Sequence, residues 1–163
     1  MRLFVAIDIP DSLKEVIKNI QQEINEEGVK LADTKKAHLT LAFYKNGDVK
    51  ELTEKIKKIS FEPFYINVKG FGLFPGHEKP RVLWLGIEYN QQLCDLKKQI
   101  KQEEFTPHIT IARLKKADSK NIIQKMRQQE IEHKFLVKEI KLYKSELTPV
   151  GSVHTVLEKQ ESK

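Results

Sequence analysis

The sequence predicts an α+β protein made of two related halves that face each other. Segments with strand-like and helix-like spacing of apolar residues alternate along the chain, a mixture typical of that class. The order strand, helix, strand, helix occurs twice, and both times the second strand begins with the motif His-x-Thr, at His38 and at His108. The 70 positions between the motifs indicate an internal duplication that has diverged too far for a repeating solenoid.

The first half is expected to open with a central strand and the clearest helix of the chain. Residues 2–8 carry apolar side chains at both parities, so both faces of the strand are expected to be buried. The helix has a capping box at Ser12 and Glu15 and a stop at Gly28, and Asp8 before it is expected to act as a cap. The other elements expected in this half are a strand at 29–31, the first motif strand at 38–44, a turn at 46–48 and a helix near 52–59.

The second half is expected to follow the same plan and to add strands at its end. Pro107 closes a helical region, because the residue before a proline disfavours the helical conformation. The expected elements are an extended segment at 64–72, a loop at 74–80, a strand at 81–87, a helix near 93–100, the second motif strand at 108–113, a helix at 119–129, and strands at 135–144 and 153–158.

Length and composition fit one domain over residues 1–163, in which two small lobes share a core. The chain is 39% hydrophobic and 32% charged, and no stretch approaches the ~20 apolar residues that span a bilayer. Cys94 is the one cysteine, which excludes an intrachain disulfide and a cysteine-based zinc site and favours a reducing, cytoplasmic location. The net charge of +6 permits a polyanionic partner such as RNA.

The two motifs carry the chemistry. Alternate side chains of a strand point to opposite faces, so His38 and Thr40 share one face, and His108 and Thr110 share another. The apolar residues between and after them are expected to anchor each strand in a core. Two such strands brought together would line a cavity with two imidazoles and two hydroxyls.

These residue types suit the opening of a cyclic phosphodiester. Histidine can act as a base toward water or as an acid toward a leaving oxygen near neutral pH. Threonine hydroxyls can donate to the charged phosphate oxygens. No third histidine or carboxylate cluster lies at ligand spacing from either motif, so we expect no metal and no other cofactor.

The sequence resembles the two-histidine (2H) phosphoesterase superfamily and, within it, the RNA 2′,3′-cyclic phosphodiesterases, also called 2′-5′ RNA ligases. The resemblance runs nearly end to end through RLFVAIDIP, HLTLAF, GLFP at 72–75, PRVLWLG at 80–86, FTPHITIAR at 105–113 and SELTPVG at 145–151. It implies two antiparallel sheets that flank a central cleft, with helices outside. It also implies that His38 and His108 are catalytic and that Thr40, Thr110 and Arg113 bind the phosphate.

Arg113 does not fit simple strand alternation, and His154 does not fit the residue type usual in the family. Arg113 has the parity of the buried Ile109 and Ile111, so a twist, a bulge or the strand end must redirect it if it reaches phosphate. His154 stands where the family often has a tyrosine. Residues 34–37 and 42–48 are also atypical for the family, and these differences bear on substrate preference rather than on chemistry.

Four other residues carry smaller predictions. Phe74 is expected to pack on its own lobe rather than to stack on a base. Arg81, at a strand start, is a candidate for RNA contact, and His77 and His133 are expected to face solvent.

The predicted reaction is hydrolysis of RNA 2′,3′-cyclic phosphate ends, and the resemblance implies 2′-phosphomonoesters as products. The partner is expected to be RNA, such as tRNA fragments. The protein is expected to be a monomer that does not enter a membrane. The reverse reaction would join a cyclic phosphate to a 5′-hydroxyl through a 2′-5′ linkage. His38 is assigned as base and His108 as acid, although nothing in the sequence distinguishes them. The alternatives are a related phosphodiesterase acting on 2′-5′ oligoadenylate or a cyclic ADP-ribose phosphate, and a non-catalytic module that binds RNA ends.

Overall fold

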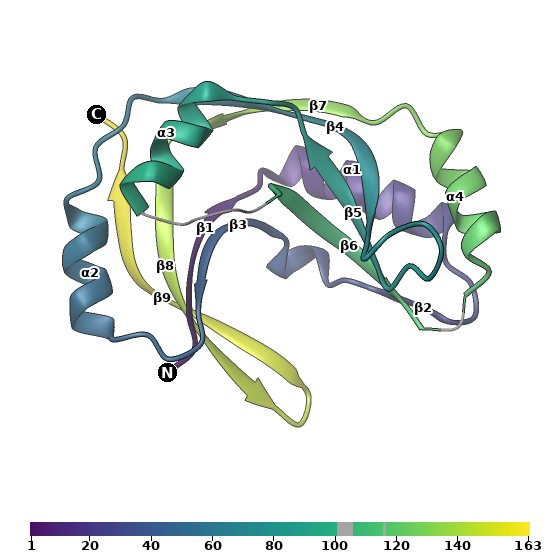
Figure 1. The fold of residues 1–163 in the computed structure, drawn as a ribbon, viewed down its shortest axis with the longest axis horizontal. Coiled ribbons are helices and arrows are strands. Elements are labelled where there is room, and N and C mark those ends of the chain that lie inside the picture. Colours follow the sequence, from purple (N-terminus) through teal and green to yellow (C-terminus); the bar gives the residue numbers. More distant parts are fainter. Residues whose placement is uncertain (101–105, 116) are drawn as a thin grey trace.

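The computed structural model describes residues 1–100, 106–115 and 117–163, and in it two antiparallel sheets share one hydrophobic core (Figure 1). The strands are β1(Leu3–Asp8), β2(Val29–Leu31), β3(His38–Tyr44), β4(Phe64–Phe74), β5(Val82–Ile87), β6(His108–Leu114), β7(Glu132–Val137), β8(Glu139–Thr148) and β9(Gly151–Glu161). The helices are α1(Asp11–Glu23), α2(Val49–Lys57), α3(Gln91–Ile100) and α4(Ser119–Arg127), with a short 3-10 turn η1(Thr34–Lys36).

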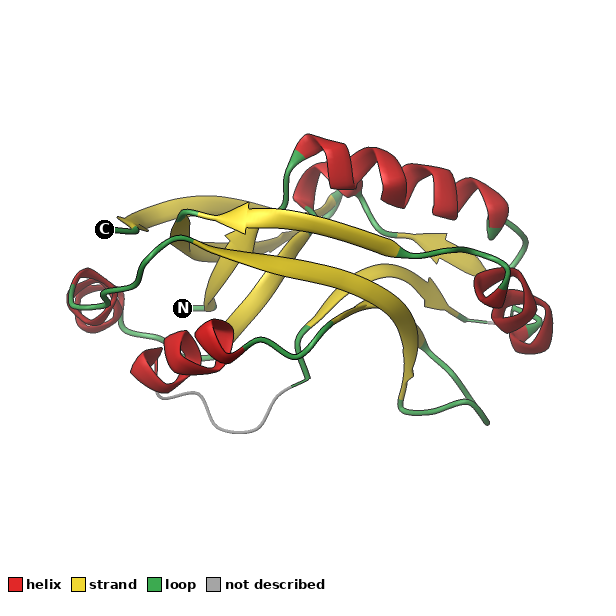
Figure 2. Ribbon diagram, turned by 90° about the horizontal axis from the view of Figure 1, so that it is seen from above, coloured by secondary structure: helices red, strands yellow, loops and turns green. Residues whose placement is uncertain are grey.

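One sheet has the order β3-β1-β8-β9 and the other the order β2-β6-β5-β4-β7. The two strands that carry the motifs, β3 and β6, belong to different sheets and contact each other. The helices lie outside the strands, as Figure 2 shows. The predicted α+β class with two antiparallel sheets and outer helices is therefore confirmed.

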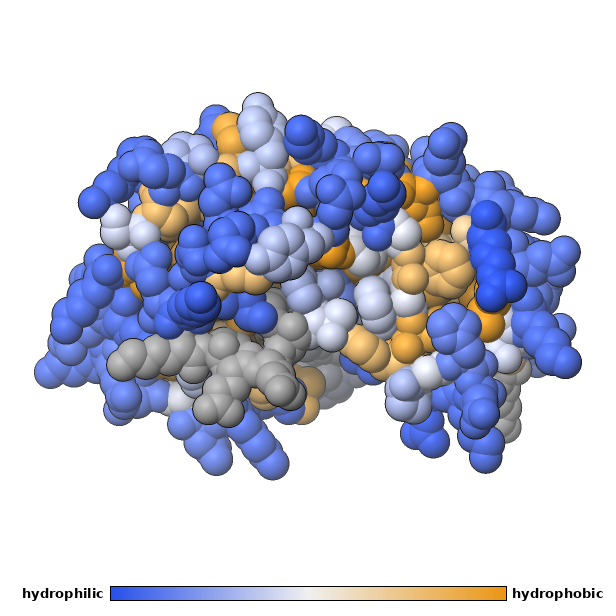
Figure 3. Space-filling model, turned by 45° about the horizontal axis from the view of Figure 1, so that its top comes forward, coloured by the Kyte–Doolittle hydropathy of each residue, from blue (hydrophilic) through white to orange (hydrophobic). Residues whose placement is uncertain are grey.

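Both sheets combine early and late parts of the chain. β2, from the N-terminal third, pairs with β6, and the C-terminal strand β8 pairs with β1. Apolar side chains of both sheets and of the helices form the shared core. Charged and polar side chains cover most of the face in Figure 3, with apolar side chains at the surface in patches between them. No helix in the described ranges is long and apolar enough to cross a membrane.

The start of α1 differs from its prediction. No side chain caps the helix, and its cap position is Pro10 rather than a residue of the expected capping box. Ser12 Oγ instead contacts His133 Nε2 at 3.1 Å, so His133 is half-buried and bonded rather than free in solvent. Asp8 accepts hydrogen bonds from side chains of β8 and caps nothing. Residues 101–105, just before the expected helix stop at Pro107, lie outside the described residues.

Both motif strands carry one extra residue directly after the threonine. The pairing of β3 with β1 skips Leu41, and the pairing of β6 with β5 skips Ile111. Such a bulge shifts the alternation of side chains by one position. The alanine that follows each extra residue is buried with it, and the next side chains, Phe43 and Arg113, are exposed. A bulge thus supplies the redirection that Arg113 requires.

A buried glutamine of α1 supports the bulge in β6. Gln21 Nε2 donates to the carbonyl oxygen of Ile111 at 3.0 Å and to that of Ala32 at 2.9 Å. The backbone N–H of Ala32 also donates to the carbonyl oxygen of Ile111, at 3.0 Å. The extra residue of the bulge is therefore hydrogen-bonded both to helix α1 and to the residue that follows β2.

Replacing this glutamine should weaken the fold. Gln21→Leu keeps an apolar side chain of similar size but removes the amide that donates to the carbonyls of Ala32 and Ile111. Loss of such partly and fully buried hydrogen bonds costs about 1–3 kcal/mol. We expect the free energy of unfolding in urea to fall by about that amount. The control is Gln22→Leu, at the exposed neighbouring position, which should change it by less than about 0.5 kcal/mol. Equal effects of the two variants would show that the buried amide does not hold the bulge.

Candidate active site

All five residues singled out in the sequence line one pocket between the two sheets. The pocket has a volume of about 580 Å³. His38 and Thr40 enter it from β3, and His108, Thr110 and Arg113 enter it from β6. The start of β9 and the segment 30–37 complete its wall. On the other side of each motif strand the apolar neighbours of the histidines are fully buried, as the alternation of strand residues predicts.

Each motif histidine is oriented by the backbone two residues before it. Nδ1 of His38 lies 2.7 Å from the carbonyl oxygen of Lys36, and Nδ1 of His108 lies 2.7 Å from that of Thr106. A carbonyl oxygen only accepts, so Nδ1 must carry the proton in both rings. In each ring Nε2 is then the nitrogen left to exchange a proton.

The residue between each histidine and its carbonyl partner explains why the two geometries match. Pro107 has its φ fixed near −65° by its ring. Ala37 takes almost the same value in the other half, with φ −62° and ψ 133°. A residue with a proline-like φ thus precedes both histidines, and in both cases the carbonyl before it reaches the ring.

Aromatic side chains hold the ring of His38. Phe4 stacks on it with centroids 4.8 Å apart and an interplanar angle of 25°. His154 of β9 meets the same ring edge-on, with centroids 5.7 Å apart. Tyr143 of β8 also stacks on Phe4, at 5.0 Å, and its ring lies 6.5 Å from that of His38. His154, whose role the sequence left open, therefore belongs to the wall of the pocket.

His108 has an aromatic support of its own. Phe74 meets its ring edge-on at 4.9 Å, and Trp84 lies 5.7 Å from it. Gly72 makes room for this indole, because a Cβ there would lie 2.2 Å from the Trp84 ring. The expectation that Phe74 packs on its own lobe is thus confirmed. It and Trp84 fix the orientation of His108.

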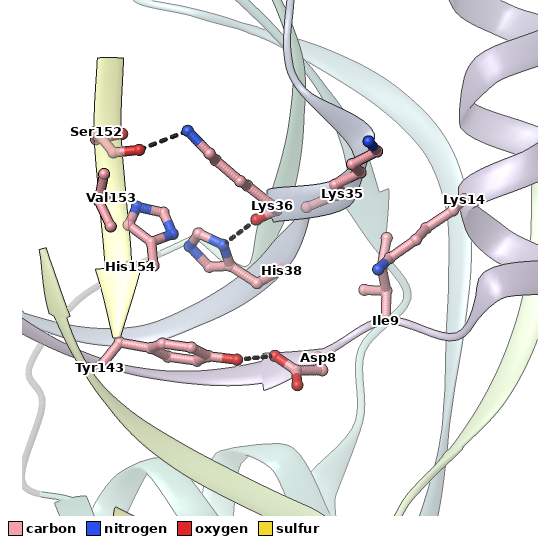
Figure 4. A pocket seen from close by; sticks show the side chains of 11 residues that line it. Asp8, Ile9, Lys14, Lys35, Lys36, His38, Tyr143, Ser152, Val153 and His154 are labelled. Atoms are coloured by element: carbon pink, nitrogen blue, oxygen red, sulfur yellow. Dashed lines mark hydrogen bonds between the residues drawn. The ribbon is translucent and has the colours of Figure 1, made fainter. Parts of the chain in front are cut away.

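A carboxylate lies beside His38 in the neighbouring strand. Asp8 is the partner of His38 in the pairing of β1 with β3. It accepts hydrogen bonds from Lys141 Nζ at 2.6 Å and from the hydroxyl of Tyr143, the latter shown in Figure 4. Burial acts to raise the pKa of Asp8, but the bonds from Lys141 and Tyr143 outweigh it and lower that pKa. Burial is the largest cause of a raised pKa of Tyr143, and the hydrogen bond to Asp8 acts in the same direction.

The pKa of His38 is lowered from its ordinary value. Burial is the largest cause, and the charge of His108 acts in the same direction. The carbonyl of Lys36 and the negative charge of Asp8 oppose this shift. A lowered pKa keeps the ring of His38 neutral at physiological pH, so its Nε2 is available to accept a proton.

Several residues of the site gave no clear signal in the sequence. Phe4, Asp8 and Tyr143 reach His38 only through the pairing of β1 with strands from distant parts of the chain. Arg81 lies outside the central pocket, in an adjoining one that shares Arg113 with it. Within the described ranges, no three residues among histidines, cysteines and carboxylates are grouped so that they could hold a metal ion.

The chain is similar to a known protein family and to named relatives over most of its length. A family model described as the 2′-5′ RNA ligase superfamily matches residues 9–149. An RNA 2′,3′-cyclic phosphodiesterase of Methanocaldococcus jannaschii is 38% identical, over 96% of this chain and 98% of its own length. The protein of the same name from Archaeoglobus fulgidus is 31% identical, over 94% of this chain and 96% of its own length.

Solved structures share the fold over the full length. TT0787 of Thermus thermophilus superposes with a TM-score of 0.81 at 26% identity, over 99% of this chain and 97% of that one. E. coli LigT complexed with 3′-AMP also gives a TM-score of 0.81, at 24% identity and with the same coverage, which shows a common fold.

The influence of Asp8 on His38 can be measured directly. Asp8→Asn removes a negative charge that favours the protonated ring, so the pKa of His38 should fall further. The pKa is read from the ring signals in an NMR titration. Asp11→Asn removes an exposed carboxylate three positions away and should leave that pKa unchanged. An unchanged or raised pKa of His38 in Asp8→Asn would contradict this electrostatic assignment.

Proposed function

Because the chain belongs to the 2′-5′ RNA ligase superfamily, we propose that it hydrolyses 2′,3′-cyclic phosphate ends of RNA to 2′-phosphomonoesters. The observation that carries the proposal is a pocket lined by both His38 and His108, in which each Nδ1 is bonded to a backbone carbonyl and neither Nε2 is hydrogen-bonded to a described residue. The relatives named RNA 2′,3′-cyclic phosphodiesterase, which match over almost their whole length, support the same substrate.

The two histidines divide the proton transfers of this reaction. His38, whose pKa is lowered by burial, takes a proton from water through Nε2 as the water oxygen attacks phosphorus. The bond from phosphorus to O3′ breaks, and His108 donates its Nε2 proton to that oxygen. The products are a 2′-phosphate and a free 3′-hydroxyl. Proton return between the rings, directly or through solvent, restores the starting state.

The other three predicted residues act on the phosphate. Thr40 and Thr110, each two residues along the strand from a histidine, present hydroxyl donors to its non-bridging oxygens. Arg113, turned out of the core by the bulge, adds a guanidinium whose geometry suits phosphate. These donors stabilise the charge that builds up in the transition state, so the proposed mechanism requires no metal ion.

The reverse direction uses the same groups. A 5′-hydroxyl in place of water would attack the cyclic phosphate, with its proton taken by the base, and would form a 2′-5′ linkage. The net charge of +6 agrees with a substrate such as RNA, including tRNA fragments, and the free Cys94 agrees with a cytoplasmic location. We propose that the enzyme acts as a monomer.

The decisive assay follows a short RNA that ends in a 2′,3′-cyclic phosphate, in excess EDTA. The wild-type protein should convert this end into a 2′-phosphate, which is distinguished from a 3′-phosphate by phosphorus NMR. His38→Ala and His108→Ala should each lower kcat at least about 100-fold, the usual loss for a positioned acid or base.

The matched control is His77→Ala, at an exposed histidine outside the pocket, which should act as wild type. Near wild-type turnover in either motif variant would rule out the two-histidine mechanism. Loss of all activity in EDTA, restored by one added metal, would overturn metal independence.

A further inference from the structure

A second, strongly basic pocket adjoins the candidate active site. It has a volume of about 670 Å³, within the range of sites that hold a small molecule. Four cationic side chains line it, from Lys79, Arg81, Arg113 and Lys115, while Glu78 is the one acidic residue among the described lining residues. Arg113 lines both pockets, so the two cavities adjoin at this residue.

We propose that this pocket binds a backbone phosphate of the RNA, upstream of the cyclic end that is turned over. The inference rests on the proposed function and adds the part of the substrate that the central pocket does not hold. It makes Arg81, Lys79 and Lys115 residues that select an RNA strand over a free cyclic mononucleotide.

Among the described lining residues, positive charges outnumber negative ones by four to one. None of its four cationic side chains forms an ion pair with a described residue, whereas lysines elsewhere, such as Lys141 and Lys159, pair with carboxylates. Lys79, Arg81, Arg113 and Lys115 are all exposed. A cluster of cations on one concave surface raises the local concentration of anions and favours a phosphate ligand.

The backbone beneath these side chains is firmly bonded. The N–H of Arg81 donates to the carbonyl of Phe74, and the carbonyl of Arg81 accepts from the N–H of Leu114, both at 2.8 Å. The N–H of Lys115 donates to the carbonyl of Gly28 at 2.8 Å. Three chain segments are therefore joined by hydrogen bonds under the pocket, which fixes the backbone positions from which the side chains of Arg81 and Lys115 extend.

The chemistry of the substrate places every further phosphate on one side of the reacting end. An RNA that ends in a cyclic phosphate has all its other phosphates on the 5′ side, so the strand must leave the central pocket in a single direction. Binding those phosphates needs cations next to the pocket but outside it. The two arginines here can each bind a phosphate through paired N–H donors.

The opposite end of the cleft is less suited to this role. The pocket there, of about 410 Å³, is drawn in Figure 4 and is lined by Lys14, Lys35 and Lys36. It also contains the carboxylate of Asp8, and the ammonium group of Lys36 is already bonded to the carbonyl of Ser152. It contains no arginine, and its lysines serve as the comparison in the test.

The test compares two substrates with the same reacting end. They are cytidine 2′,3′-cyclic phosphate and a short RNA that ends in that nucleotide. The variant is Arg81→Gln with Lys115→Gln, which leaves Arg113 in place. We expect kcat/KM for the RNA to fall about tenfold or more, the effect of losing one charge-assisted hydrogen bond, while kcat/KM for the mononucleotide stays within about twofold.

Salt dependence gives a second readout. For the RNA, the slope of log(kcat/KM) against log of the salt concentration should become shallower in the variant by about 0.7 for each lost phosphate contact. The control, Lys14→Gln with Lys35→Gln, removes the same charge at the other end of the cleft and should leave both substrates and the slope unchanged.

The possible outcomes separate this inference from the proposed function. Suppose that the wild type turns over both substrates. If kcat/KM of the variant is then unchanged for both, or falls equally for both, the inference alone is wrong. If the Lys14 and Lys35 variant shows the RNA-specific loss, the strand leaves by the other end and the inference is again wrong. If the wild type opens neither substrate, the proposed function fails and the inference falls with it.

Discussion

The hydrogen bond from Nδ1 of each histidine to the carbonyl two residues earlier determines what the rest of the cleft can do. It fixes the tautomer, so that Nε2 alone is left to exchange protons at both positions. It also fixes the ring plane, which the flanking aromatic side chains then hold. Proton transfer at phosphorus needs both properties, because a base or acid must be in the correct protonation state and within reach of its oxygen. Pro107 and the proline-like φ of Ala37 produce this geometry twice.

The bulge after each threonine is the second shared feature of the motif strands. It lets one strand bury two successive residues and still present the following side chain on the exposed face. In β6 that side chain is Arg113. In β3 it is Phe43, and there a guanidinium comes from the residue just before β1, since Arg2 lies over the Phe43 ring at 5.4 Å. The matching bulges support the proposal that the two lobes are diverged repeats of one unit. Their sheets nevertheless take strands from both parts of the chain.

Local patterns in the sequence were sufficient to predict the motif strands, the side of each strand that is buried and the four motif residues that meet in one pocket. The fifth residue, Arg113, was implied only by the family resemblance. Features that depend on distant pairing could not be predicted in this way. The partners of Asp8 come from β8, more than a hundred residues away, and the expected capping box failed because Ser12 contacts His133 of β7. The direction of Arg113 depends on a bulge held by Gln21, and strand alternation alone gives the opposite answer.

The most direct test of the paired histidines is the pH dependence of kcat/KM on an RNA 2′,3′-cyclic phosphate. If one ring must be neutral and the other protonated, the profile is bell-shaped, and its two limbs belong to the pair rather than to single residues. The lowered pKa of His38 should place the acid limb below the ordinary histidine value of about 6.5. A bell with its acid limb in that region is the result predicted here. A profile that stays flat from about pH 5 to 9, with chemistry shown to be rate-limiting, would mean that the histidines only bind the phosphate.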